Sequence, residues 1–235
     1  MKKILVILFA VLLLIPLGVG SIQSPEGFAG ELWGSTFALY GSKKDVTHFY
    51  CTAEPIAKVE GGYQLLSAGH CVQDAPLDLQ FSVAEETGGA RTPVTMDKAY
   101  LSNTIDFALF TLKTTKNYTV FALGDEKDLH VGDITINPNF AIGIGKQLSI
   151  GIVSSLPMME SEDCPANECV GKFMVQEYAG PGASGSAVLS AKTHKVVGVL
   201  VYEFYDGSVG FAIEPISAFA TFMAGPNQPH PVREK

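Results

Sequence analysis

The chain has 235 residues, of which 47% are hydrophobic and 17% are charged, and its formal net charge is −8. This composition excludes an intrinsically disordered chain, which would be poor in apolar residues. With 16 Lys and Arg against 24 Asp and Glu, the chain also lacks the positive charge that would hold a nucleic acid.

The N-terminal segment has the layout of a secretory signal. Lys2 and Lys3 precede an apolar run over residues 4–19, and the small residues Gly20 and Ser21 follow it. We therefore predict a signal peptide over residues 1–20 and a secreted protein, periplasmic or extracellular. The run is just short of the about 20 residues that span a bilayer. An uncleaved N-terminal anchor is the alternative, and membrane attachment is expected only in that case.

Beyond residue 28 the chain consists of short β-type runs bounded by Gly, Asn, Asp and Pro, which predicts an all-β sandwich or closed barrels. These runs cover residues 35–41, 63–69, 79–84, 106–112, 134–140, 147–156, 172–180, 186–190, 195–204 and 208–216. No substantial helical pattern precedes Ile216, and residues 216–223 predict one short helix before a polar tail over 226–235. The loop between Thr114 and Val131 is the expected boundary between two halves.

Four cysteines in an exported chain are expected to form disulfides, and four allow three connectivities. We favour the pairs Cys51 with Cys71 and Cys164 with Cys169. Neither pair is accompanied by the two histidines of a zinc site. We therefore predict no metal and no cofactor.

The most informative motif is the segment Gly182-Ala183-Ser184-Gly185-Ser186. Glycines beside a serine let a substrate carbonyl approach closely and leave backbone N–H groups free for a developing oxyanion. A flexible linker has a similar composition. Strand-like runs flank this segment, however, which favours a tight turn inside a folded body.

A hydroxyl nucleophile needs a base, and the base needs a group that orients it. His70 ends a strand-like run in a small-residue turn, and Asp106 opens an apolar run where an unpartnered carboxylate would be costly. Taken alone, each residue fits a structural role. Together with Ser184 they fit a catalytic triad.

These three motifs resemble those of the trypsin-like, chymotrypsin-fold serine peptidases. The matching segments are Ser67-Ala-Gly-His-Cys71, Asp106-Phe-Ala-Leu109 and Gly182-Ala-Ser-Gly-Ser186. The order His, Asp, Ser along the chain is that of the chymotrypsin fold and differs from that of subtilisins and α/β-hydrolases. The pair Cys51 and Cys71 also matches the bridge that holds the histidine loop in this family.

The resemblance implies two six-stranded antiparallel β-barrels of the chymotrypsin type with a short C-terminal helix. The first barrel, over residues 28–120, would carry His70 and Asp106, and the second, over 130–225, would carry Ser184. Ser184 would be the nucleophile, His70 the base and Asp106 the group that orients it. The N–H groups of Gly182 and Ser184 would form the oxyanion hole, and Ser186 would be structural.

The chain departs from vertebrate trypsin at positions that matter. Ala183 stands where trypsin-like zymogens carry the Asp that pairs with a new N-terminus, so the chain is closer to the bacterial and viral members. The expected substrate pocket involves five residues that give no clear residue preference. They are Tyr178, Val201, Tyr202, Glu203 and Gly210.

The sequence therefore predicts a secreted serine endopeptidase that acts on protein or peptide substrates through an acyl-enzyme intermediate. Two alternatives remain. One is an inactive relative that only binds extended peptides by strand addition. The other is a cell-envelope interaction protein.

Overall fold

The structure is a computed structural model, and part of the chain is described in it. The described residues are 25–43, 46–73, 75–76, 78–102, 105–156, 171–203 and 210–226. The predicted signal peptide, Cys164 with Cys169, and the polar tail beyond residue 226 lie outside them. Within the described segments, no helix is long and apolar enough to cross a membrane.

The first half of the chain forms a closed barrel of six antiparallel strands in the order β1-β2-β3-β6-β5-β4. The strands are β1 (Phe37–Lys43), β2 (Val46–Val59), β3 (Gly62–Ser67), β4 (Gln80–Ala84), β5 (Arg91–Leu101) and β6 (Asp106–Lys113). Their inward-facing side chains are large and apolar, and they include the fully buried Phe37, Leu65 and Phe110.

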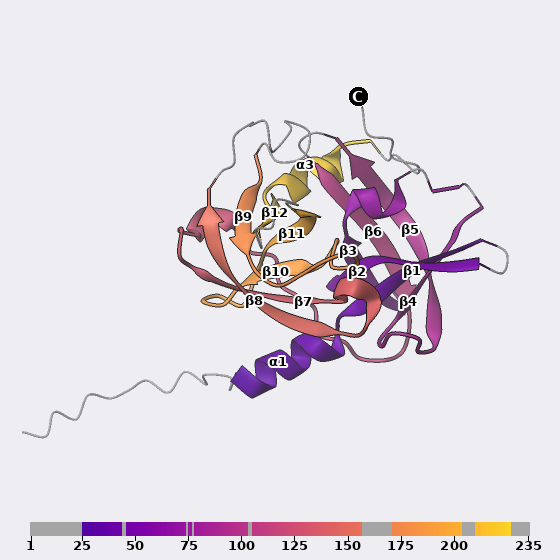
Figure 1. Cartoon of the computed structure of the whole chain (residues 1–235). Coiled ribbons are helices and arrows are strands. Elements are labelled where there is room, and N and C mark those ends of the chain that lie inside the picture. The colour runs from indigo at the N-terminus through magenta and orange to yellow at the C-terminus, as the bar shows by residue number, and fades with distance from the viewer. Residues whose placement is uncertain are drawn as a thin grey trace, which may run out of the picture.

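The second half forms another closed six-stranded barrel, in the order β10-β11-β12-β9-β8-β7. Its strands are β7 (Ile134–Asn139), β8 (Gln147–Ser155), β9 (Phe173–Gln176), β10 (Ala187–Ser190), β11 (Val196–Glu203) and β12 (Gly210–Pro215). The barrels lie side by side (Figure 1). The predicted fold class, two six-stranded antiparallel barrels, is confirmed.

The predicted C-terminal helix is present as α3 (Ala218–Ala224). It follows the second barrel but packs on the first, because Phe219 and Phe222 contact Phe107 with ring centroids 5.8 and 5.6 Å apart. Lys98 of β5 donates hydrogen bonds to two carbonyls at the end of the helix, at 2.8 and 2.6 Å. The helix therefore ties the two barrels together (Figure 1).

Three elements were not among the sequence-predicted runs. Strand β2 contains Pro55, which is accommodated where the register with β3 shifts, and proline is tolerated in sheets at such bulges. Strand β5 is exposed over its first three residues, and a register shift between Met96 and Lys98 interrupts its buried alternation. The helix α1 (Pro25–Gly34) has several glycines and a weak apolar face. Periodicity could not detect any of them.

The two barrels meet where β2 contacts the turn before β10. The N–H of Thr52 donates to the Ser184 carbonyl at 2.8 Å. Glu54, two residues on and fully buried, accepts from the N–H of Ala187 at 3.1 Å. Burial raises the pKa of Glu54 well above its usual value, although this hydrogen bond opposes the shift.

Gly185 lies at the closest point of this contact. A Cβ there would overlap Ser67 Oγ and would lie 2.5 Å from the Thr52 carbonyl oxygen. Its φ of +87° also belongs to the left-handed region that favours glycine. Only a glycine lets the two barrels approach this closely.

The interior of the second barrel holds an unpartnered acid. Glu177, directly after β9, is 4% exposed, and neither of its carboxyl oxygens has a hydrogen-bond partner among the described residues. Burial raises its pKa to about 8. Burial therefore favours the neutral form of the Glu177 carboxyl in the folded protein.

We expect Gly185→Ala to lower the stability of the protein, because the new methyl group would force β2 and the turn apart. The control is Gly88→Ala, since Gly88 has a φ of +73° but a Cβ at this position would meet nothing within 4 Å. Both variants bear the left-handed backbone cost of about 1 kcal/mol. Urea unfolding should show a clearly larger loss for Gly185→Ala, and equal losses would contradict the close contact.

We expect Glu177→Gln to remove a pH dependence of stability. The carboxyl has a usual value of 4.5 and a folded pKa of about 8, so folding takes up a proton between these pH values. Glu177 should lower wild-type stability there by about 1.4 kcal/mol per pH unit as the pH rises, in addition to the falls due to Glu54 and Glu214, whose pKa values burial also raises. Glutamine cannot ionise, so the free energy of unfolding of Glu177→Gln should gain on that of the wild type from pH 5 to pH 8.

The exposed Glu60 provides a control for this measurement. The difference between Glu60→Gln and the wild type should stay nearly constant over the same pH range. A constant difference for Glu177→Gln as well would show that its carboxyl ionises freely in the folded protein.

Candidate active site

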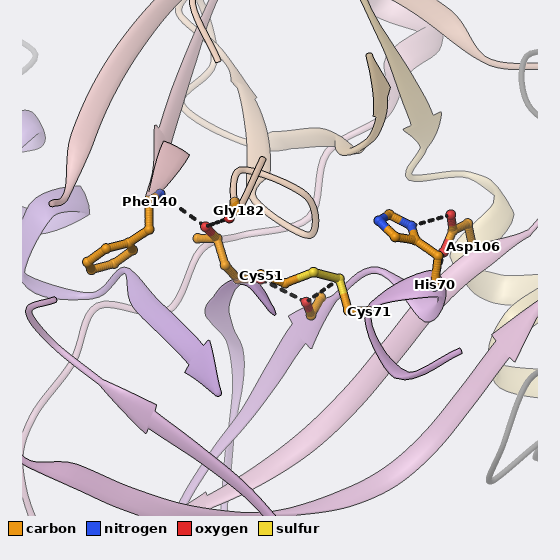
Figure 2. Close-up of a disulfide and its surroundings, with 8 residues drawn as sticks. Cys51, His70, Cys71, Asp106, Phe140 and Gly182 are labelled. Atoms are coloured by element: carbon orange, nitrogen blue, oxygen red, sulfur yellow. Dashed lines mark hydrogen bonds and ion pairs between the residues drawn. A yellow bond between two sulfur atoms is a disulfide. The ribbon is translucent and has the colours of Figure 1, made fainter. Parts of the chain in front are cut away.

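His70 and Asp106 come together through the pairing of β3 with β6. Ser67, the last residue of β3, pairs with Ala108, so the turn that carries His70 lies beside the start of β6. Asp106 accepts two hydrogen bonds of 2.8 Å, from the Nδ1 atom of His70 to Oδ2 and from its backbone N–H to Oδ1. Figure 2 shows the imidazole facing the carboxylate. Asp106 therefore positions both the ring and the main chain of His70.

The charge on Asp106 is maintained despite its burial. Burial alone would raise its pKa, but the charge of His70 and its two hydrogen bonds outweigh burial and hold the pKa below its usual value. An ionised Asp106 accepts the Nδ1 proton, which leaves Nε2 of the neutral ring as a proton acceptor. The His70 side chain is 22% exposed.

The structure contains the predicted disulfide between Cys51 of β2 and Cys71, next to His70 (Figure 2). It joins the histidine turn to the strand that contacts the second barrel. The two sulfur atoms and a ring nitrogen of His70 lie within 4.8 Å of one another. The sulfurs are bonded to each other, so this group offers no thiolate ligand for a metal.

The turn that carries Ser184 is held through its carbonyl groups. Every carbonyl from Gly180 to Ser184 accepts a hydrogen bond. The donors, in order, are the N–H of Ala183 (2.9 Å), the N–H of Ile142 (2.6 Å), the hydroxyl of Thr52 (2.8 Å), the N–H of Ser186 (3.0 Å) and the N–H of Thr52 (2.8 Å). The conformation of the turn is thus determined by both barrels.

The first four residues of the turn have the signature of a type II turn. Pro181 takes the second position and Gly182, with a φ of +98°, the third. A trans peptide points its N–H away from its carbonyl. With the carbonyls of Pro181 and Ala183 bound, the N–H groups of Gly182 and Ser184 are directed away from those bonds. Neither has an acceptor among the described residues.

Ser184 itself is half-buried, and its carbonyl is held by Thr52. The structure brings its turn against the segment that leads to His70, because Gly185 lies next to Ala68. No hydrogen bond joins the Ser184 hydroxyl to His70, both of which are described residues. Such a bond is often long in a peptidase without substrate and shortens on binding.

The predicted pocket residues lie on and beside the sheet of β9, β12 and β11. Tyr202 and Gly210 are paired there with Ala212 and Gln176. Val201 is 7% exposed, whereas Tyr178, two residues beyond β9, is 65% exposed. The side chain of Glu203 lies outside the described part. The role of these five residues stays a prediction.

Sequence reasoning missed Thr52 and a buried polar network under the turn. Ser186 exchanges hydrogen bonds of 2.9 and 3.1 Å with Asn137, which in turn is bonded to Asn139 at 2.7 Å. Asn139 continues the network to Ser149, whose hydroxyl donates to the carbonyl of Tyr178. Polar residues alternate along 135–139, and this alternation is the one sequence signal that could have indicated the buried polar network.

The comparisons with solved structures agree with this architecture. The HtrA-type protease AlgW with a decapeptide has a TM-score of 0.67 at 18% identity, over 84% of this chain and 66% of that chain. The same protease with a tripeptide has a TM-score of 0.63 at 20% identity, over 84% and 61%. The serine endoprotease from Yersinia pestis has a TM-score of 0.63 at 16% identity, over 84% and 64%.

At these identities the likeness shows the fold, and this chain spans 61% to 66% of the length of these three structures. No curated protein matches the chain in sequence. The model of the trypsin-like peptidase domain matches residues 56–199, which contain His70, Asp106 and Ser184. The predicted resemblance is therefore confirmed, and the chain belongs to the trypsin-like peptidase family, with a structure like that of its bacterial members.

Proposed function

We propose that this protein is a secreted serine endopeptidase in which Ser184, His70 and Asp106 form the catalytic triad. The observation that carries the proposal is the pair of 2.8 Å hydrogen bonds by which Asp106 holds His70. They engage Nδ1 and the backbone N–H of His70 and leave Nε2 without a hydrogen-bond partner among the described residues, which supports its role as the base for Ser184. A merely structural histidine would have no need of a free nitrogen opposite a serine turn.

The mechanism follows from this arrangement. Ser184 Oγ attacks the carbonyl carbon of the scissile bond while Nε2 of His70 takes its proton. The imidazolium that forms is stabilised by the ionised Asp106 and returns the proton to the leaving amine. Water then enters, His70 activates it in the same way, and it hydrolyses the acyl-enzyme ester to regenerate Ser184.

The N–H groups of Gly182 and Ser184 are the donors for the oxyanion. Both lack a described acceptor, while the neighbouring N–H groups of Ala183, Gly185 and Ser186 donate to carbonyls of the protein. Two free and fixed donors are what a tetrahedral intermediate requires. In comparable sites the loss of one such donor lowers turnover about 10²- to 10³-fold.

The substrate class and compartment belong to the same proposal. AlgW was solved with a tripeptide and with a decapeptide, which supports a peptide as the ligand of this protein. The disulfide between Cys51 and Cys71 supports an oxidising compartment, as do the N-terminal lysines and apolar run. The substrate would be a protein or peptide outside the cytoplasm.

We expect Ser184→Ala to abolish hydrolysis of fluorescein-labelled casein without lowering the melting temperature, because only the nucleophilic oxygen is removed. Asp106→Asn should lower turnover about 10⁴-fold, since the amide favours the wrong imidazole tautomer. A fluorophosphonate probe should label the wild type and leave Ser184→Ala unlabelled.

Ser186→Ala is the matched control. Its hydroxyl is fully buried and bonded to Asn137, so this variant should lose stability and still be labelled. If labelling persisted in Ser184→Ala and was lost in Ser186→Ala, the nucleophile would be Ser186. A wild type that binds peptides but neither cleaves casein nor reacts with the probe would be an inactive binding protein instead.

A further inference from the structure

The hydroxyl of Thr52 joins three segments that are distant in sequence. It donates to the carbonyl of Gly182 at 2.8 Å and accepts from the N–H of Phe140 at 3.1 Å. In Figure 2 the dashed lines from Phe140 and Gly182 converge on this one oxygen. The first bond spans 130 sequence positions and the second 88. Thr52 thus connects β2 with the turn of Ser184 and with the end of β7.

The backbone N–H and carbonyl groups of Thr52 are also hydrogen-bonded. Its N–H donates to the Ser184 carbonyl at 2.8 Å, and its own carbonyl accepts from Ser67 Oγ at 2.7 Å. The residue is fully buried. Only a hydroxyl can donate and accept in the same place, so without it the Phe140 N–H and the Gly182 carbonyl would both be left unpaired and buried.

The Gly182 carbonyl belongs to the peptide that links the two oxyanion donors. The preceding peptide carries the N–H of Gly182, and the following one carries the N–H of Ser184. The orientation of the linking peptide therefore sets the angle between both donors. Two hydrogen bonds oppose rotation of this peptide: its own N–H, at Ala183, donates to the Gly180 carbonyl at 2.9 Å, and its carbonyl accepts from the Thr52 hydroxyl at 2.8 Å. The second bond ties the peptide to the other barrel.

We propose that Thr52 is a positioning residue of the oxyanion hole, which holds the Gly182 carbonyl so that the N–H groups of Gly182 and Ser184 point to the same oxyanion. Thr52 acts through these amides. This inference rests on the proposed function, because it assigns a role within the same site.

The test compares Thr52→Val, which keeps the shape and removes the hydroxyl, with the wild type. The substrate is a fluorogenic peptide selected from a library by cleavage with the wild type. The concentration of active enzyme is titrated with a fluorophosphonate. We expect kcat per active site to fall about 10-fold or more, within the range known for a lost oxyanion donor, while KM changes less than about 3-fold.

A peptide aldehyde of the same sequence gives the decisive readout, because its adduct with Ser184 carries the oxyanion. Its inhibition constant should weaken in Thr52→Val by about the same factor as kcat/KM. A purely structural role would lower the fraction of active enzyme and leave both kcat per active site and this inhibition constant unchanged.

Two matched variants separate the hydroxyl from general effects. Thr52→Ser keeps the oxygen and should retain kcat within about 3-fold. Thr36 is also fully buried, and its hydroxyl donates to the Leu32 carbonyl at 2.8 Å and makes no hydrogen bond to the turn. Thr36→Val should therefore lose stability and keep the kcat and aldehyde inhibition of the wild type.

The outcomes are distinguishable. If Ser184→Ala is inactive and Thr52→Val equals the wild type in kcat and aldehyde inhibition, the inference is overturned and the proposed function stands. If the wild type itself neither cleaves peptides nor reacts with the fluorophosphonate, both the proposed function and this inference are overturned. If Thr52→Val does not fold, Thr52→Ala takes its place, since it also removes the hydroxyl. The same loss of kcat and aldehyde affinity is expected.

Discussion

The contact between β2 and the turn of Ser184 is the constraint on which the site depends. His70 and Asp106 belong to the first barrel, whereas Ser184 belongs to the second. Residues 52 and 54 share one face of β2, since side chains alternate along a strand. Thr52 binds the turn and Glu54 binds the first residue of β10. These bonds set the position of one barrel relative to the other at the point where the chemistry would occur.

Three buried acids show how partners decide charge in this protein. Asp106 has two donors from His70 and stays ionised. Glu54 has one donor and Glu177 has none among the described residues, and burial raises the pKa of both. A buried carboxylate is stable only where hydrogen bonds or positive charge replace water. Of these three, Asp106, which must carry charge in the mechanism, has the most donors. A fourth buried acid, Glu214, forms an ion pair with Lys172 at 3.1 Å, but burial still raises its pKa to about 8.

Much of the fold could be predicted because its signals are local. Short apolar runs marked most strands, and small-residue motifs indicated the turns of His70 and Ser184. The hydrophobic pattern did not predict β2, β5 or α1. A bulge at Pro55 interrupts the pattern of β2, the first residues of β5 are exposed, and α1 contains several glycines. The prediction of two six-stranded barrels came from the resemblance to the chymotrypsin-fold peptidases, because the hydrophobic periodicity alone did not show all twelve strands.

The sequence by itself determined the order of the three motifs, the residue types of the candidate triad, the pairing of Cys51 with Cys71 and the family. These properties depend on residues that are close in the chain or that form specific motifs. Only the tertiary structure decided the role of Thr52, the free N–H groups of Gly182 and Ser184, and the raised pKa of Glu177. Each of these depends on groups that meet across a barrel or between barrels. The pattern of residues along the chain does not show which distant groups contact one another in the folded interior.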